Sequence, residues 1–308
     1  MMQPTLSSLQ NELFTLLPPY LTEFLTPKTE EIRFRRNCPV IFLENGQELI
    51  TPYRFDSQQM EDLVDHLTEG SLSSCFESIN EGYLTVKGGH RIGLSGTAVY
   101  DGNRLTYVKD ISSVNFRIAK EVPGAADRLF QAVGHLDPLP GILIISPPGH
   151  GKTTLLRDFL RQLSEKRVNL RIAVVDERGE IAATWQGEMQ NRLGIRCDIL
   201  NRYQKSDGIR SAIRSLSPNV IAVDEIGTSE DEKSLLYAYH TGVSIIATIH
   251  GDNTDQFRKN IKKLTREQVF SYEVYVSKHC SCDRIEVIKR TNGESNDKTV
   301  RIDSFDIR

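Results

Sequence analysis

One apolar run in this chain passes directly into a glycine-rich loop, a combination that few folds can accommodate. Residues 142–154 read ILIISPPGHGKTT, and the apolar run at the start of this segment is typical of a buried strand. Gly149 and Gly151 lack Cβ atoms, so the backbone there can turn its N–H groups inward around an anion. The segment nearly matches G-x-x-x-x-G-K-[ST], the loop that cradles nucleotide phosphates. The sequence therefore predicts a strand, a phosphate-binding loop and then a helix.

The polar residues of this loop have separate expected tasks. Lys152 brings a flexible positive charge to the β- and γ-phosphates, and Thr153 offers its hydroxyl to Mg²⁺. Apolar residues after Lys152 recur at helical spacing, so a helix N-terminus is expected to point at the anion. Ser146 stands where the first glycine of the pattern is expected, and the alternative is a chance turn between a strand and a helix. The predicted nucleotide-binding residues are Pro148, Gly149, His150, Gly151, Lys152, Thr153 and Thr154.

Three more apolar runs end in titratable side chains. These ends are Asp176–Glu177 after residues 171–175, Asp224–Glu225 after residues 219–223, and His250 at the end of residues 243–250. Ligands of an open parallel sheet bind beyond the carboxyl ends of its strands, so we expect all of these side chains at one edge with Lys152. Taken alone, Asp176–Glu177 is better explained as a helix cap or a solvated turn.

An apolar strand that ends in Asp-Glu is typical of the second signature of a P-loop ATPase. Asp224 is expected to accept hydrogen bonds from water bound to Mg²⁺. Glu225 is expected to orient and deprotonate the attacking water. The loop and this strand end together predict an Mg²⁺-dependent ATPase.

Length and composition set the remaining limits. The chain has 308 residues, enough for two domains, and its 39% hydrophobic and 26% charged residues are those of a globular protein. The net charge of −3 gives no general electrostatic case for binding nucleic acid or an anionic membrane. Five cysteines favour reduced thiols in the cytoplasm, and the Cys280–Cys282 pair has no second pair that would indicate zinc. We expect no signal peptide and no membrane-spanning run of about 20 apolar residues.

The pattern along the chain predicts an α/β protein with two domains. We expect an N-terminal α+β domain over residues 1–122 and an ATPase domain with a mostly parallel, RecA-like sheet over residues 123–308. The predicted segments are a helix over 6–26 broken at Pro18–Pro19, strands over 31–43, a helix over 56–67 capped by Asp56, a β-rich stretch over 82–119, a linker over 121–141, and a hairpin over 284–307 that turns at Asn292–Gly293. One of the strands 171–177 and 219–224 is expected beside the strand of the phosphate loop.

The order of the motifs resembles that of a known family. After the phosphate loop come VVDERGEIAA (174–183), SPNVIAVDEIG (217–227) and IIATIHG (245–251). This order resembles the P-loop, Asp box, Asp-Glu strand and His box of the type II and type IV secretion ATPases. A closer resemblance, over about residues 30–290, is to the stage III AA family of sporulation proteins. It includes the segments GGHRIGLSGTAV and SVNFRIA before the loop.

The resemblance implies roles for particular residues. Asp176 and Glu177 would form the Asp box near the metal and water, and His250 would sense the γ-phosphate. Arg91 and Arg117 of the N-terminal domain would fold over the nucleotide; no acidic partner is obvious at cross-strand spacing for either. The implied metal-binding residues are Thr153, Asp224 and Asp176, and the implied catalytic residues are Glu225, Glu177, His250, Arg91 and Arg117.

The resemblance also implies partners and a place of action. ATP and Mg²⁺ would be the cofactors of a motor that forms a ring, expected to be a hexamer. The motor would power assembly of, or transport through, an envelope-spanning channel during endospore formation. It would work in the cytoplasm of the mother cell, docked at the cytoplasmic face of membrane channel proteins of the sporulation apparatus.

Two other functions use the same residues. The first is a nucleic-acid-dependent ATPase of the RecA or helicase type, which two basic clusters would serve: Arg33, Arg35 and Arg36, and then Lys259, Lys262, Lys263 and Arg266. A solvated strand or helix face explains such clusters more simply. The second is a nucleotide-gated scaffold with negligible turnover, which intact Lys152, Asp224 and Glu225 argue against.

Overall fold

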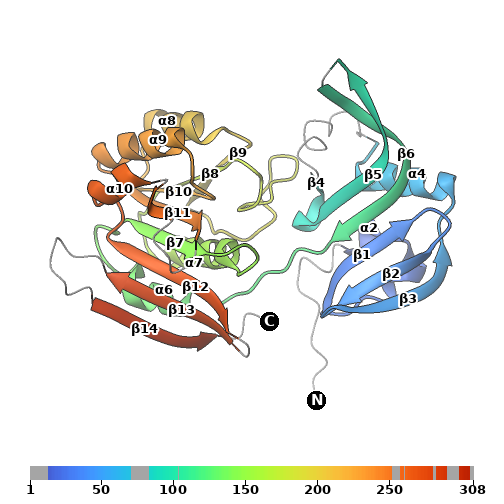
Figure 1. The fold of residues 1–308 in the computed structure, drawn as a ribbon, viewed down its shortest axis with the longest axis horizontal. Helices are drawn as coiled ribbons and strands as arrows, with labels where there is room; N and C mark the ends of the chain where they lie inside the picture. Colours follow the sequence, from blue (N-terminus) through green and yellow to red (C-terminus); the bar gives the residue numbers. More distant parts are fainter. Residues whose placement is uncertain are drawn as a thin grey trace. The chain divides into compact units, whose positions relative to one another are not determined.

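The computed structural model divides the chain into two compact units, each with its own sheet and core (Figure 1). The N-terminal unit consists of Met1–Glu121 with Ala183–Gln190, and the second unit of Val122–Ala182 with Asn191–Arg308. The structure describes residues 13–70, 83–102, 104–251, 257–259, 261–279, 282–289 and 298–305.

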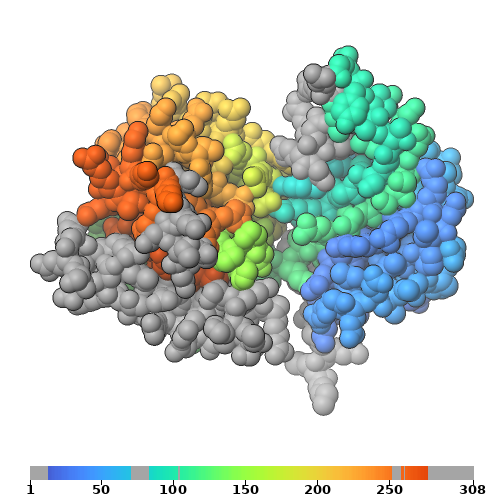
Figure 2. All heavy atoms as spheres, in the orientation of Figure 1, coloured from blue at the N-terminus to red at the C-terminus, as the bar shows by residue number. Residues whose placement is uncertain are grey.

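The N-terminal unit is built on a six-stranded sheet in the order β3-β2-β1-β6-β5-β4. Its elements are α2 (Leu13–Leu16), α3 (Pro19–Thr22), β1 (Thr29–Arg35), β2 (Pro39–Glu44), β3 (Gln47–Arg54), α4 (Ser57–Leu67), β4 (Leu84–Thr85), η2 (Lys87–Gly89), β5 (Arg91–Asp101) and β6 (Arg104–Arg117). Beyond the residues that pair with β4 and β1, the strands β5 and β6 continue as a two-stranded ribbon (Figure 1). Figure 2 shows the atoms of this ribbon in teal within the N-terminal unit. The α+β character predicted for this part is confirmed.

The local signals in this unit are also confirmed. Asp56 caps α4 through a capping box, because its side chain accepts from the Gln59 N–H while the Gln59 side chain accepts from the Asp56 N–H. The helical segment near the N-terminus is interrupted before Pro19, since a proline ring cannot continue a helix from the preceding turn.

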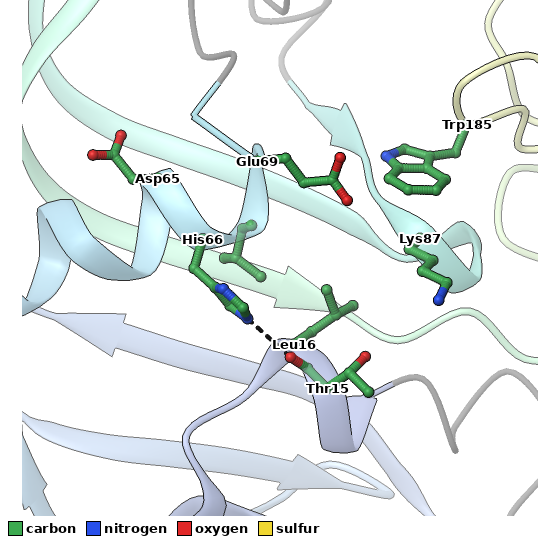
Figure 3. Close-up of a pocket in the computed structure, with 8 residues that line it drawn as sticks. Thr15, Leu16, Asp65, His66, Glu69, Lys87 and Trp185 are labelled. Carbon is green, nitrogen blue, oxygen red and sulfur yellow. Dashed lines mark hydrogen bonds between the residues drawn. The ribbon is translucent and has the colours of Figure 1, made fainter.

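A short segment from between two strands of the second unit belongs to the N-terminal unit. Gln190 Oε1 accepts from the Gly88 N–H at 2.9 Å, and Gln186 Nε2 donates to Glu69 Oε2 at 2.8 Å. Trp185 of this segment lines a cavity of about 410 Å³ together with Glu69 and Lys87 (Figure 3). No local pattern in the sequence indicates this insertion, because its contacts join segments that lie about 100 residues apart.

The second unit is a three-layer α/β domain around an eight-stranded sheet in the order β14-β13-β12-β7-β11-β10-β8-β9. The six strands from β12 to β9 are parallel, and β13 and β14 add an antiparallel edge. The strands are β7 (Ile142–Ser146), β8 (Ile172–Asp176), β9 (Cys197–Asn201), β10 (Val220–Val223), β11 (Ser244–His250), β12 (Tyr272–His279), β13 (Cys282–Lys289) and β14 (Lys298–Phe305). The mostly parallel sheet predicted for this unit is confirmed.

Helices cover both faces of this sheet, so its inner strands are buried on both sides and read as unbroken apolar runs. On one face α7 (Lys152–Lys166) packs with α6 (Asp127–Leu129) and η3 (Phe130–Gly134). On the other face lie α8 (Lys205–Ser215), α9 (Ser229–His240) and α10 (Lys262–Arg266), while η4 (Phe257–Lys259) precedes α10. Alternate residues of each strand feed the two cores, as the pleat requires.

The predicted neighbour of the phosphate-loop strand was wrong. β7 lies between β11 and β12, and β10 and β8 follow on the far side of β11. The strands β7, β8 and β10 and the middle of β11 are mostly apolar and buried, so their composition does not distinguish one order from another. The order depends on which crossover helices pack on which face, and this is a long-range property.

The predicted linker over 121–141 is mostly part of the second unit's core. Ala125, Leu129 and Val133 are buried, and the N–H of Ala126 donates to the buried carboxylate of Asp158 at 2.8 Å. Proline and glycine in this segment indicated a loop, but its apolar residues are spaced to cover α7. Only the passage at Glu121–Val122 joins the two units there.

The predicted C-terminal hairpin is confirmed as the antiparallel pair β13 and β14. Its predicted turn at Asn292–Gly293 lies outside the described residues. Cys280 of the Cys280–Cys282 pair also lies outside them.

No helix within the part of the chain that the structure describes combines the length and apolar composition that a membrane crossing needs.

Candidate functional site

The loop between β7 and α7 has the backbone of an anion cradle. Gly149 and Gly151 adopt positive φ values of 74° and 85°, a region that residues with a Cβ rarely enter. Gly151 is the N-cap of α7 and supplies no side-chain acceptor, so the first N–H groups of the helix have no intrahelical partner. Such a helix N-terminus is a ready site for phosphate. The nucleotide-binding residues predicted over 148–154 all lie in this loop and the first turn of α7.

The register of the parallel strands brings the other polar strand ends to the same edge. Ser146 at the end of β7 pairs with His250 at the end of β11, and Ala247 of β11 pairs with Val223 at the end of β10. Asp224 and Glu225 follow Val223 directly. The strand ends of β7, β11 and β10 therefore meet, as the sequence predicted.

Lys152 is the centre of the resulting cluster and is only 6% exposed. Its Nζ donates to Glu225 Oε1 at 3.1 Å and lies 3.3 Å from each ring nitrogen of His250. The Nε2 of His250 in turn lies 2.8 Å from Glu225 Oε1. The structure thus brings together the loop lysine, the acid and the histidine from three separate strand ends.

Asp224 lies beside this cluster and contacts two hydroxyls. Thr153 Oγ1 donates to Asp224 Oδ2 at 3.1 Å, and the hydroxyl of Thr248 donates to Asp224 Oδ1. The N–H of Glu225 donates to Thr248 Oγ1 at 2.9 Å. Sequence reasoning missed Thr248. The signal available was a polar residue two positions before His250, on the same face of an otherwise apolar strand.

Glu225 occupies a strained backbone position and is surrounded by cations. Its φ is 49°, in the left-handed region that costs a residue with a side chain about 1–2 kcal/mol. Its second oxygen forms an ion pair with Arg178, which sequence reasoning also missed. Burial alone would raise the pKa of Glu225, but the hydrogen bond and charge of Lys152, helped by Arg178 and His250, outweigh burial and lower that pKa. The carboxylate is therefore held ionised.

Asp176 has a different environment at the end of β8. It is 1% exposed, and its carboxylate accepts the N–H groups of Glu180 at 2.8 Å, Ile181 at 3.1 Å and Ala182 at 2.8 Å. Burial raises its pKa, against the opposing effect of these three hydrogen bonds. Both oxygens are engaged in folding the loop that follows, so this geometry favours a structural role over the predicted metal ligand.

Glu177 turns to a different partner from the Lys152 cluster. Its carboxylate forms an ion pair with Lys205 at the start of α8. The predicted catalytic role of Glu177 gains no support from this contact.

Arg91 and Arg117 belong to the N-terminal unit, so the prediction that they close over the nucleotide stays a prediction. They lie directly opposite each other on β5 and β6, and the guanidinium of Arg91 lies 4.7 Å from the centre of the Tyr83 ring. The expectation that Arg117 lacks an acidic residue at cross-strand spacing was wrong, because Glu31 of β1 pairs with it in register. This pairing crosses about 85 residues of sequence and leaves no local trace.

The residues of the cluster suit a nucleotide with Mg²⁺. The described residues contain no group of three or more His, Cys, Asp or Glu that could hold a metal by itself. Mg²⁺ commonly uses one or two protein oxygens together with substrate phosphates and water. The hydroxyl of Thr153 and the carboxylate of Asp224 are hard oxygen donors of this kind beside the glycine loop.

The two basic clusters predicted as possible nucleic-acid-binding surfaces differ in their surroundings. Arg33 pairs with Glu31, and Arg36 donates to the carbonyl of Ile111. Lys262 and Arg266 lie exposed on the short helix α10.

The second unit has the RecA-like fold of the secretion and pilus ATPases. The X-ray structure of the Legionella pneumophila ATPase DotB superposes with a TM-score of 0.59 over 95% of this chain and 84% of that chain, at 16% identity. The crystal structure of the pilus retraction motor PilT with bound ADP superposes with a TM-score of 0.61 over 94% and 84%, also at 16% identity. At such identity the likeness shows the fold alone.

The sequence then places the chain within a family. The family model described as "Sporulation stage III, protein AA" matches residues 15–295, and the chain belongs to this family. Stage III sporulation protein AA of Bacillus subtilis (strain 168) is 35% identical over 280 residues, which are 87% of this chain and 91% of that protein. The family resemblance indicated by the motifs is confirmed.

Proposed function

We propose that this chain is an Mg²⁺-dependent ATPase that works as a motor. The observation that carries the proposal is the cluster at the carboxyl edge of the sheet, where Lys152, Glu225 and His250 contact one another within 3.3 Å. Asp224 and Thr153 lie beside this cluster, and their side chains offer two oxygen atoms of the kind that Mg²⁺ binds. The fold shared with PilT, a motor whose structure contains ADP, supports the same assignment.

The residues of the cluster divide the work of hydrolysis. The loop N–H groups and Lys152 bind the phosphates, which offer Lys152 a charged acceptor in exchange for Glu225. Glu225 then holds the attacking water and accepts its proton, while Arg178 and His250 keep its carboxylate in place. Thr153 and Asp224 would hold Mg²⁺, which neutralises charge on the phosphates when bound.

The direct test is Lys152→Ala in the full chain. We expect nearly complete loss of ATP hydrolysis and weaker nucleotide binding, because the loop loses its point charge. The matched control is Lys166→Ala at the far end of α7, where the lysine donates to Gln162 and lies over the Phe130 ring. Near-wild-type turnover in Lys152→Ala would overturn the proposed ATPase activity.

We propose further that Arg91 and Arg117 complete the nucleotide site. Two arginines directly opposite on neighbouring strands concentrate positive charge at one place, and Glu31 of β1 pairs in register with Arg117 alone. This concentration of charge favours the binding of an anion such as a phosphate. Either Arg→Ala substitution should lower turnover while leaving the melting temperature without nucleotide nearly unchanged. Point variants are required, because residues 183–190 belong to the N-terminal unit and a truncation at Glu121 would not separate the units.

The biological role that we propose is a ring-shaped homo-oligomer, of six copies, at the cytoplasmic face of membrane channel proteins in the mother cell. It would drive assembly of, or transport through, an envelope channel during endospore formation. Membership of the sporulation family supports this role. Expression in Bacillus subtilis that lacks its relative should restore sporulation, and Lys152→Ala should not. Light scattering of the purified chain with ATP should give the mass of six copies.

A further inference from the structure

Thr248 of β11 is buried in the sheet and contacts both acidic residues of the Asp224–Glu225 pair. It is 0% exposed. Its hydroxyl donates to Asp224 Oδ1 and accepts the N–H of Glu225 at 2.9 Å. A threonine hydroxyl has one proton to donate, so these two bonds assign its proton to the carboxylate.

The sheet places Thr248 on the face that faces α7. Strand residues alternate between the two cores, and Ile246 of β11 and Ala222 of β10 both belong to the core that α7 covers. Two positions further along the chain in each case, Thr248 within β11 and Asp224 directly after β10 lie on that same side of the sheet. The first turn of α7 carries Thr153 there. Asp224 is therefore held between two hydroxyls, with Thr248 on Oδ1 and Thr153 on Oδ2.

Thr248 also contacts the turn that follows β10 through its main chain. Its carbonyl accepts the N–H of Ile226 at 2.9 Å, so Thr248 contacts both N–H groups after Asp224. The N–H of Glu225 is shared between Thr248 Oγ1 and Asp224 Oδ1, which lies 3.0 Å away. Glu225 between them has a φ of 49°, a conformation that persists only when its surroundings fix it. The carbonyl bond survives any change of side chain. A change of the side chain therefore leaves this main-chain bond in place and tests the side chain alone.

We propose that Thr248 is the positioning residue for both acids: its hydroxyl aims the Asp224 carboxylate at Mg²⁺ and fixes the start of the turn that carries Glu225. This rests on the proposed ATPase function and adds a residue that acts through others without touching the nucleotide. Partners that orient a metal-binding carboxylate typically change metal affinity or activity by about 10–100-fold when they are removed.

The experiment compares two substitutions of Thr248 that remove different groups of its side chain. Thr248→Val keeps the shape and loses the hydroxyl, whereas Thr248→Ser keeps the hydroxyl and loses a methyl group. Binding of a fluorescent ADP is titrated in Mg²⁺ and in EDTA. We expect Thr248→Val to weaken binding about 10-fold in Mg²⁺ with no change in EDTA, and to lower kcat about 10–100-fold. Thr248→Ser should stay within about twofold of the wild type in both measurements, because its hydroxyl makes the same bonds.

The control for loss of a buried hydroxyl is Thr68→Val in the N-terminal unit, where Thr68 donates to the carbonyl of Val64 at 2.8 Å. It should leave the Mg²⁺ dependence unchanged. If Thr248→Val does not fold, Thr248→Cys tests the same point, since a thiol is a weak donor and acceptor of similar size.

The outcomes separate this inference from the proposed function. Wild-type Mg²⁺ dependence in Thr248→Val, or in Thr248→Cys if that is the variant used, would overturn the positioning role. Equal losses in Thr248→Ser and Thr248→Val would also overturn it, because any change at this buried position would then have the same effect whether or not the hydroxyl is kept. If the wild-type chain itself neither binds nor hydrolyses nucleotide, the proposed function fails instead.

Discussion

Two strands that lie side by side in the same sheet, β8 and β10, end in the same dipeptide and use it differently. Asp176 is buried and binds three N–H groups of its own loop, and Glu177 pairs with Lys205. Asp224 binds two hydroxyls, and Glu225 lies among three cationic or titratable side chains from other elements. An acidic pair at a strand end therefore gains its chemical role from the side chains and N–H groups that face it.

The difference arises from the neighbours of each strand. β10 lies beside β11, whose end carries Thr248 and His250, and α7 begins over that edge with Lys152. β8 lies between β10 and β9, and the chain after β8 folds back over its own strand end. The carboxylate of Asp176 is therefore already hydrogen-bonded to the N–H groups of its own loop.

The largest expected effect separates the two glutamates in catalysis. Glu225→Gln should keep ATP binding and slow hydrolysis by about 10²–10⁴-fold, because the general base is lost. Glu177→Gln should leave turnover within about threefold of the wild type, since Glu177 is partly exposed and forms an ion pair with Lys205. Single-turnover hydrolysis by both purified variants measures this. The reverse result would move the base to β8.

The second effect separates the two aspartates in stability. Asp176→Ala should lower the free energy of unfolding by about 3 kcal/mol, because three loop N–H groups lose their acceptor in a buried place. Asp224→Ala should cost less, since it removes a charge whose repulsion raises the pKa of Asp176. Urea unfolding of both variants tests the pair. A larger loss in Asp224→Ala would make Asp224 the structural residue.

A smaller effect concerns the Glu177–Lys205 ion pair. A double-mutant cycle with Glu177→Gln and Lys205→Gln should give a coupling energy of about 0–1 kcal/mol, because the glutamate is partly exposed and water screens the pair. The cycle is measured by urea unfolding in low salt and in 0.5 M salt. A coupling well above this range that resists salt would show a buried pair with a structural task.

The smallest effect is a pH dependence at Asp176. Its pKa is raised in the folded protein above the ordinary 3.8, so its ionisation costs stability as pH rises from that value through the folded pKa. Asp176→Asn removes this dependence. The destabilisation caused by the variant should therefore be larger at pH 4.5 than at pH 7.5. A larger destabilisation at pH 7.5 would mean that the three hydrogen bonds outweigh burial and lower the pKa.

Much of the site was predictable because its signals are local. Each signal spans only a few positions: the glycine loop at 149–151, the lysine that follows it, and each apolar strand together with the polar residue at its end. Thr248 and Arg178 were missed because their importance depends on partners in other strands and loops. Trp185 and its segment were missed for the same reason, since their contacts lie with the N-terminal unit.

Local patterns were enough to predict the α/β character of the second unit, the phosphate loop, and the edge of the sheet at which the polar residues gather. These follow from hydrophobic periodicity and glycine conformation, which act over a few residues. Three other features came from long-range packing: the strand order, the inclusion of 183–190 in the N-terminal unit, and the choice of the acidic pair that faces Lys152. These depend on pairing between distant segments whose local patterns are alike, so only the packing of the whole chain distinguishes them.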